Sequence, residues 1–283
     1  AELEGVDAVI NLSGRSVDCR YTDRNRRLIL DSRIESTRVL GEAIAACRQP
    51  PAVWMNASTA TIYRHSFDRP MDEATGEIGA TPEARDAFSI EVATAWEAAL
   101  DRAATGAVRK VALRAAMVLG REGGVFPVLR RLVRLGLGGR MGTGRQYMSW
   151  IHAEDFCRAA AWILDHPGSR GPINLAAPEP VPNAAFMAAM RRHCGLPVGL
   201  PAARWMLEAG ALVLRTETEL ILKSRRVVPG RLLAEGFRFR FPTLDSALED
   251  LGRRDGGSGR ESLDTDFTDS HGREGNWTTS GSG

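Results

Sequence analysis

The stretch AVINLSG, residues 8–14, decides the fold class, because it is a continuous apolar run that ends on a small residue and a glycine. A run of this kind is typical of a parallel strand that is covered on both faces, here Ala8–Leu12. Thr22 then stands at a helix start, and apolar residues at helical spacing extend that helix to about Arg48. The chain therefore begins with a strand followed by a helix.

The same alternation continues along the chain. AVWMNAST, residues 52–59, predicts a second strand, residues 88–104 a second helix, and KVALRAAMVLG, residues 110–120, a third strand. This order is typical of an α/β protein with a doubly wound parallel sheet. Further on, Asn183 and Thr243 are predicted helix caps, and the alternating FRFRF, residues 237–241, predicts a half-buried strand.

Composition excludes several classes of function. The chain has 283 residues, 43% of them apolar, which is enough for a sizeable core, and its net charge of +2 is too small to indicate nucleic acid binding. No apolar run is long enough to cross a membrane, and no signal-peptide pattern is present. The four cysteines are scattered, which is typical of reduced thiols. We therefore expect a cytoplasmic protein with no membrane and no nucleic acid partner.

The end of the chain differs in composition from the rest. Residues 253–283 are rich in glycine and serine and contain few large apolar side chains, so we expect a disordered tail.

The carboxyl ends of the predicted strands mark a candidate ligand site. Small and polar residues follow each strand, at 11–14, 57–60 and 117–120. Parallel sheets bind ligands at this edge, and small residues allow a ligand to approach the backbone. Ser13 and Gly14 alone would equally fit a tight turn, but three such ends on one sheet favour a ligand crevice.

A series of motifs in a fixed order makes the resemblance specific. The segments DAVINLSG, DSRIESTRVL, NASTATIY, LRAAMVLGREGGV, GLGGRMGTGRQYMSWIHAEDF, NLAAPEPVPNAAF and RVVPGRLLAEGFRFRFPTL resemble the epimerase-like family of the short-chain dehydrogenase/reductase superfamily. This branch is often labelled nucleoside-diphosphate-sugar epimerase or cell-division inhibitor, and it has its own small C-terminal domain. The resemblance covers about residues 5–251. It implies a truncated Rossmann-like, NAD(P)-binding domain with substrate-side insertions over residues 1–180 and the small family-specific α+β domain over residues 181–252.

The same resemblance implies that an opening segment is missing. Family members begin with a strand, a glycine-rich G-x-x-G-x-x-G turn and a helix before the AVINLSG strand, and the helix amides bind the cofactor pyrophosphate. The glycine-rich GLGGRMGTG offers no G-x-G-x-x-G, because Met141 and Tyr147 stand where the third glycine would be. We therefore expect an N-terminally truncated fragment that lacks roughly 50 residues.

Several cofactor contacts are implied by matching positions. Leu12, Ser13 and Gly14 would lie against the cofactor, and Arg33 on the first helix would reach a phosphate, unless it is a solvated helix arginine. Val118 matches the family position beside the nicotinamide.

Arg114, inside the third strand, needs a partner because an unpaired buried charge is costly. That partner is either a carboxylate or an anionic ligand, and we count Arg114 among the candidate cofactor contacts.

The catalytic residues of the superfamily are only partly matched. Active members use a Ser or Thr with a Tyr and a Lys in Y-x-x-x-K, where the lysine lowers the tyrosine pKa. Thr59 occupies the Ser/Thr position, and Ser58 beside it is counted among the candidate cofactor contacts. Ser89 and Ala93 stand where the tyrosine and lysine belong. Tyr63 is the candidate that could supply a phenol instead, although a packed tyrosine is the more frequent outcome.

Two further features have structural and functional readings. His152 and Asp155 match an H-x-x-D motif at a helix start, which favours a structural joint over a catalytic pair and makes no metal site. Residues 109–145 carry nine basic side chains and one acid, which suits either a solvated face or the rim of a site for a phosphorylated substrate.

Two functions follow from these features. The first is an NADP(H)-dependent epimerase or oxidoreductase, with NAD also compatible, that acts on a small substrate, for which a sugar nucleotide is one candidate. The alternative is a dinucleotide-binding sensor or partner-binding module without turnover, which the replacement of tyrosine and lysine by Ser89 and Ala93 favours. The oligomeric state is left open.

Overall fold

The computed structural model describes residues 2–203, 205–208 and 219–253, and the described residues up to Gly252 form one compact unit. Apart from Arg253, the predicted tail lies outside the described residues. The central sheet has the order β1-β2-β3-β7, and all three strand pairs are parallel. The strands are β1 (Ala8–Asn11), β2 (Val53–Thr59), β3 (Arg109–Ala115) and β7 (Gly171–Leu175). The predicted α/β class with a parallel sheet is confirmed.

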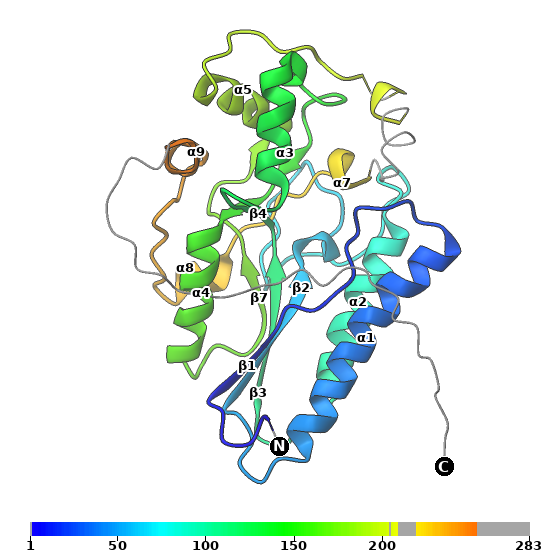
Figure 1. Ribbon diagram of the computed structural model, residues 1–283, viewed down its shortest axis with the longest axis vertical. Coiled ribbons are helices and arrows are strands. Elements are labelled where there is room, and N and C mark those ends of the chain that lie inside the picture. The colour runs from blue at the N-terminus through cyan, green and yellow to red at the C-terminus, as the bar shows by residue number, and fades with distance from the viewer. Residues whose placement is uncertain (1, 204, 209–218, 254–283) are drawn as a thin grey trace, which may run out of the picture. The chain divides into compact units, whose positions relative to one another are not determined.

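Helices cover both faces of this sheet. Helices α1 (Asp23–Ala45) and α2 (Ala87–Arg102) lie side by side on one face, and α4 (Ala153–Asp165) lies on the other (Figure 1). Along β2, Trp54 packs into the cluster on the α1–α2 side, whereas Met55 packs into the cluster on the α4 side. Burial on both faces explains why the strands are continuous apolar runs.

Two of the three predicted helix caps are confirmed. The Thr22 hydroxyl accepts a hydrogen bond from Asn25 N at 3.3 Å, and Thr243 accepts one from Ser246 N at 3.3 Å at the start of α9 (Leu244–Gly252). Asn183 is not a cap. It is the first residue of α5 (Asn183–His193), and its Oδ1 accepts a hydrogen bond from Met141 N at 2.8 Å, which ties α5 to a distant loop.

The predicted third strand is two strands. After β3 ends at Ala115, β4 (Met117–Leu119) turns away from the main sheet and pairs in parallel with β6 (Trp150–His152). The break follows from a change of partner, because Ala116 N still donates to Leu175 O, whereas Met117 N donates to Ser149 O. The apolar run predicts the strand residues, but it does not indicate that β3 and β4 pair with different strands.

The FRFRF segment is not a strand. Phe237 and Phe241 are buried and the arginines between them are exposed, so the predicted alternation of burial is correct. The backbone amides of Arg240 and Phe241 donate to the Asp155 carboxylate, each at 2.8 Å, instead of pairing with a neighbouring strand. The alternation of phenylalanine and arginine therefore indicates which side chains are buried, but it does not indicate a strand.

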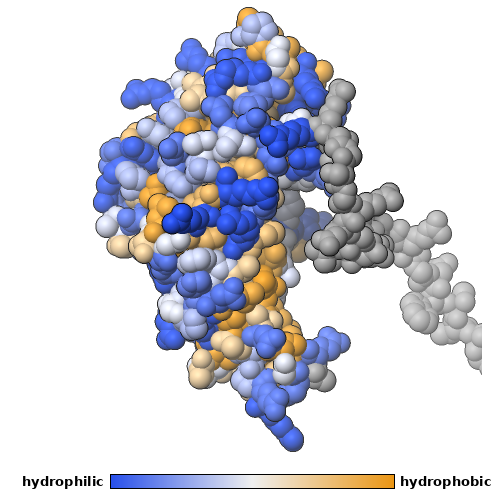
Figure 2. Space-filling model, turned by 90° about the vertical axis from the view of Figure 1, so that its left-hand side faces the viewer, coloured by the Kyte–Doolittle hydropathy of each residue, from blue (hydrophilic) through white to orange (hydrophobic). Residues whose placement is uncertain are grey.

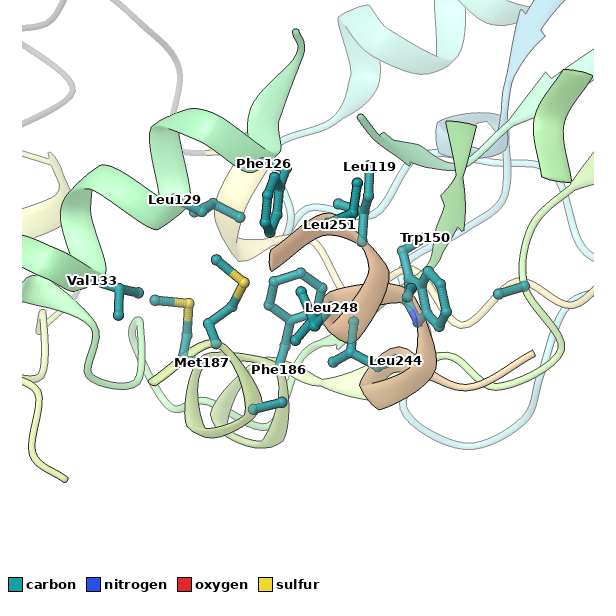
Figure 3. Packing of buried hydrophobic residues seen from close by; sticks show 14 of the residues in the cluster. Leu119, Phe126, Leu129, Val133, Trp150, Phe186, Met187, Leu244, Leu248 and Leu251 are labelled. Carbon is teal, nitrogen blue, oxygen red and sulfur yellow. The ribbon is translucent and has the colours of Figure 1, made fainter. Parts of the chain in front are cut away.

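A second core joins the C-terminal elements to the region after β4. Side chains of α3 (Val125–Leu132), α5 and α9 converge in it, with Phe186 beside Met187 and Leu248 (Figure 3). The remaining elements are short: η1 (Ala60–Ile62), η2 (Val133–Leu137), β5 (Tyr147–Met148), β8 (Val181–Pro182), α7 (Glu219–Leu222) and α8 (Gly230–Ala234). Among the described residues, no helix combines the length and apolar character needed to cross a membrane.

The β1 edge of the sheet is apolar. Ile10 in β1 is 46% exposed and Leu12, just after it, is 58% exposed. Apolar residues also gather in the lower half of the face that Figure 2 shows, below a more hydrophilic upper half. Because β1 lies at the end of the strand order, its outer edge pairs with no strand in the described part of the chain.

Candidate functional site

A cavity of about 270 Å³ lies at the carboxyl ends of β2 and β3, against α1 and α2. These strand ends share one edge of the sheet, because Thr59 pairs in register with Ala115. Aromatic rings of Tyr21, Phe88 and Trp96 form its apolar walls. Its polar lining includes one cation and the aliphatic hydroxyl groups of four residues, from Arg33, Ser58, Thr59, Thr61 and Ser89.

Arg33 is held in place at the rim of this cavity. Its Nη1 donates to Ile29 O at 3.0 Å and to Arg15 O at 3.1 Å, and its guanidinium carbon lies 4.9 Å from the centre of the Trp96 ring. Gly14 packs so closely that a Cβ there would lie 3.3 Å from Arg33 Cζ. Burial lowers the pKa of Arg33. The fold thus brings Gly14 next to Arg33, and contact of either residue with a cofactor stays a prediction.

Ser58 and Thr59 present their hydroxyls differently. The Ser58 hydroxyl donates to Glu97 Oε1 at 2.6 Å. Thr59 Oγ1 accepts a hydrogen bond from Thr61 N at 3.1 Å, and among the described residues its own hydroxyl proton has no acceptor. Thr59 is therefore able to donate a hydrogen bond to a group in the cavity.

A buried network surrounds Arg114, which is 5% exposed. Its Nε and Nη2 donate to the two oxygens of Glu97 at 2.8 and 2.7 Å, and its Nη1 donates to the Tyr63 hydroxyl at 2.8 Å. Burial alone would lower the pKa of Arg114, but the bidentate Glu97 carboxylate raises it above its ordinary value. Of the two partners considered for Arg114, the structure contains the carboxylate; contact with a cofactor stays a prediction.

Tyr63 belongs to the same network and does not line the cavity. Its side chain is 1% exposed, and its hydroxyl donates to Asn174 Oδ1 at 3.0 Å while it accepts from Arg114. Burial raises the pKa of the Tyr63 phenol. The contacts are those of a packed tyrosine, and the catalytic role of Tyr63 stays a prediction without support from this geometry.

Five predicted cofactor contacts lie outside the cavity lining: Leu12, Ser13, Gly14, Arg114 and Val118. Leu12 is exposed, and Ser13 N donates to Asn11 Oδ1 at 3.0 Å. Val118 packs against the apolar cluster beneath α4. None of the basic residues from 109 to 145 lines the cavity either. Of the predicted site residues, Arg33, Ser58 and Thr59 line the cavity. The other predicted site residues lie along or behind the same edge of the sheet.

The glycines of GLGGRMGTG do not form a phosphate-binding turn. Gly136, Gly139 and Gly142 have G-x-x-G-x-x-G spacing, which a search for G-x-G-x-x-G overlooks. The amides of Gly139 and Gly142 donate to the carbonyls of Leu200 and Ala202 at 3.1 and 2.8 Å. These amides are therefore engaged within the protein.

Ser89, in place of the family tyrosine, lines the cavity and donates to Glu219 Oε2 at 2.6 Å. Ala93, in place of the lysine, is fully buried. Sequence reasoning missed Glu219 because it lies 130 residues from Ser89 and belongs to no motif.

The segment from Glu219 to Arg225 carries further buried charge. Lys223 Nζ lies 2.5 Å from Asp86 Oδ2, and both side chains are completely buried. Arg225 Nε donates to Thr61 Oγ1 at 3.1 Å. Burial raises the pKa of Glu219 and lowers the pKa of Lys223. The C-terminal part of the chain therefore lies behind the cavity lining, hydrogen bonded to Ser89 and Thr61.

His152 and Asp155 form a structural joint. His152 Nδ1 accepts a hydrogen bond from Glu154 N at 3.1 Å and caps α4, and the ring lies 4.0 Å from the Phe241 ring. Asp155 binds the two backbone amides of the FRFRF segment. The two side chains serve different contacts, and within the described ranges no cluster of three or more His, Cys, Asp and Glu side chains could hold a metal.

Known proteins resemble this chain over most of its length. The profile of the NAD dependent epimerase/dehydratase family matches residues 1–176, and a domain of unknown function, DUF1731, matches residues 202–251. Epimerase family protein SDR39U1 of Bos taurus is 33% identical over 253 residues, covering 88% of this chain and 83% of the relative. Epimerase family protein Mb2239 of Mycobacterium bovis is 35% identical over 247 residues, covering 87% and 78%.

A solved structure agrees with this relationship. The crystal structure of human epimerase family protein SDR39U1 with NADPH superposes with a TM-score of 0.78 at 30% identity, covering 88% of this chain and 83% of the human one. The matched family profile spans more than half of the chain, and the relatives share its Rossmann-like sheet and C-terminal domain. The chain therefore belongs to the NAD dependent epimerase/dehydratase family, an epimerase-like branch of the short-chain dehydrogenase/reductase superfamily.

Proposed function

We propose that this protein is an NADP(H)-dependent epimerase or oxidoreductase whose cavity receives the nicotinamide end of the dinucleotide. The observation that carries the proposal is the convergence of Arg33, Thr59 and Ser89 on one cavity at the carboxyl ends of parallel strands. The NADPH of the human relative supports the choice of NADP over NAD.

The cavity fits only part of a dinucleotide. Its volume of about 270 Å³ lies below the roughly 300–1,000 Å³ of complete small-molecule sites. Thr59 can donate a hydrogen bond to the bound group, and the Arg33 guanidinium can pair with an anionic oxygen. When bound, a nicotinamide supplies or accepts a hydride. The cavity residues position the reacting carbon and limit access of water.

The rest of the dinucleotide would follow the edge formed by Leu12, Ser13 and Gly14. Leu12 and Ser13 are exposed there, and Gly14 leaves the backbone open to a ligand above Arg33. A phosphate-binding turn beside the free edge of β1 would complete the site.

Arg33→Met tests the cation. We expect about tenfold weaker NADPH binding, equivalent to about 1.4 kcal/mol, because the variant keeps the packing against Trp96 and loses the charge. Arg27→Met is the matched control, since Arg27 is an exposed arginine on the same helix. Equal affinities in calorimetry would remove Arg33 from the site.

A second candidate function is a dinucleotide-binding sensor or partner-binding module without turnover. The observation that favours it is the buried Ala93 in place of a catalytic lysine. The absorbance of bound NADPH, followed against ketones and sugar nucleotides, separates the two functions. Binding of NADPH without oxidation by any of these compounds would favour the sensor.

A further inference from the structure

The cavity wall contains a serine that is hydrogen bonded to a buried carboxylic acid from the far end of the chain. Ser89 comes from the first turn of α2, and Glu219 begins α7. Ser89 Oγ lies 2.6 Å from Glu219 Oε2, and Glu219 is only 7% exposed. Of these two side chains, only Ser89 lines the cavity. The Glu219 carboxyl group is therefore linked to the cavity through its hydrogen bond with the Ser89 hydroxyl.

The surroundings of Glu219 allow its carboxyl group to be protonated. Within the described part of the chain its Oε1 has no hydrogen-bond partner, and Arg225 Nη2 is 3.9 Å away. The other charged groups that face it are Lys223 and Asp86, which pair with each other. The charge on Glu219 is therefore less fully compensated than in a bidentate pair, and burial raises its pKa.

We propose that Ser89 and Glu219 form a proton-transfer pair, in which Ser89 contacts the substrate oxygen and Glu219 acts as a positioning residue that supplies or receives the proton through it. When Glu219 is protonated, its O–H donates to Ser89 Oγ, and the Ser89 hydroxyl is free to donate into the cavity. When Glu219 is ionised, Ser89 donates to it instead. This inference rests on the proposed function.

The hydride, the electron pair and the protons are all accounted for in both directions of the reaction. During reduction of a carbonyl, its carbon gains the hydride that reduced nicotinamide gives up, and the C=O electron pair moves to the oxygen. That oxygen takes the Ser89 proton, and Glu219 passes its proton to Ser89 Oγ. During oxidation of an alcohol, the proton moves from the substrate oxygen to Ser89 and from Ser89 to Glu219. Ser89 and Glu219 together would thus do the work of the absent tyrosine and lysine.

The first experiment tests the pair without cofactor. The infrared band of the protonated Glu219 carboxyl is obtained in the full chain as the difference between the wild type and Glu219→Gln across a pH series. In Ser89→Ala we expect this carboxyl to ionise at higher pH, because its ionised form has lost a hydrogen bond. An identical titration in the wild type and Ser89→Ala would overturn the pair.

The second experiment tests the role, with excess NADPH and 9,10-phenanthrenequinone as the carbonyl probe. Glu219→Gln should bind NADPH within twofold of the wild type, oxidise it about 100-fold more slowly and lose the pH inflection of the rate. Glu219→Asp should recover part of the rate. Glu91→Gln is the matched control, since it makes the same change on an exposed residue of α2.

The outcomes separate the two proposals. An active wild type with an equally active Glu219→Gln, or with an unchanged pH profile, would overturn the proton-transfer pair and leave the proposed function standing. A wild type that binds NADPH and transfers no hydride to the probe would overturn both.

Discussion

Two serines line the same cavity, and each donates a hydrogen bond of 2.6 Å to a glutamate behind it. Behind Ser58, Glu97 is also bound in bidentate fashion by Arg114. Behind Ser89, Glu219 has Arg225 only at 3.9 Å and keeps one oxygen without a hydrogen bond among the described residues. The first carboxylate is locked by its partners, whereas the second can exchange a proton.

The difference teaches that a buried charge near a site does not by itself indicate chemistry. Arg114 and Tyr63 were candidates because of their residue types and positions, yet their polar groups are engaged with each other, Glu97 and Asn174. The contrast between Glu97, which Arg114 holds, and Glu219, which can exchange a proton, gives three predictions. They follow in order of decreasing effect.

Arg114→Met should lower the free energy of unfolding by about 3–5 kcal/mol, because it leaves Glu97 as a nearly buried carboxylate without its cation. Urea denaturation measures the loss. The double variant with Glu97→Leu should recover much of it, since no unpaired charge remains. A loss below about 1 kcal/mol, as for an exposed ion pair, would contradict the locked network.

Tyr63→Phe should cost about 1–3 kcal/mol, because Arg114 Nη1 and Asn174 Oδ1 both lose a buried partner. We expect NADPH binding and turnover to be retained, since the phenol does not reach the cavity. Unchanged stability together with lost turnover would instead support Tyr63 as the catalytic phenol.

Glu219→Gln should change how stability depends on pH. The pKa of Glu219 is raised by burial above its ordinary value of 4.5, so the folded protein holds this proton where the unfolded chain has released it. The contribution to stability is complete below the ordinary pKa and is lost as the pH rises through the folded pKa, by at most about 1.4 kcal/mol per pH unit.

Urea denaturation of both proteins between about pH 4 and pH 8 measures this contribution. Burial also raises the pKa of Glu73, but Glu73 is present in both proteins and its effect cancels. Parallel curves for the wild type and Glu219→Gln would show that Glu219 exchanges no proton in this range.

Much of the fold was predictable because burial leaves a pattern in neighbouring residues. The central strands are buried on both faces and read as apolar runs, and Thr22 and Thr243 cap the helices that they precede. The FRFRF segment shows the limit of such patterns, since its burial alternates although the amide of Phe241 binds a carboxylate and not a strand.

The site was predictable only where it follows a strand end or the adjoining helix. Ser58 and Thr59 end β2, and Arg33 lies one helix away, so topology alone brings them together. Glu219 reaches Ser89 across 130 residues through a tertiary contact that leaves no periodicity in the sequence. The identity of the buried acid therefore required the structure.

The most direct test of the account is a crystal structure of this protein grown with excess NADPH. We predict that the nicotinamide riboside lies in the cavity, with Thr59 within hydrogen-bond distance of it, its reactive carbon facing Ser89 across the space for the substrate oxygen, and Arg33 at the rim. A nicotinamide bound elsewhere, with this cavity closed by its own side chains, would contradict the central claim that these strand ends form the reactive part of a dinucleotide site.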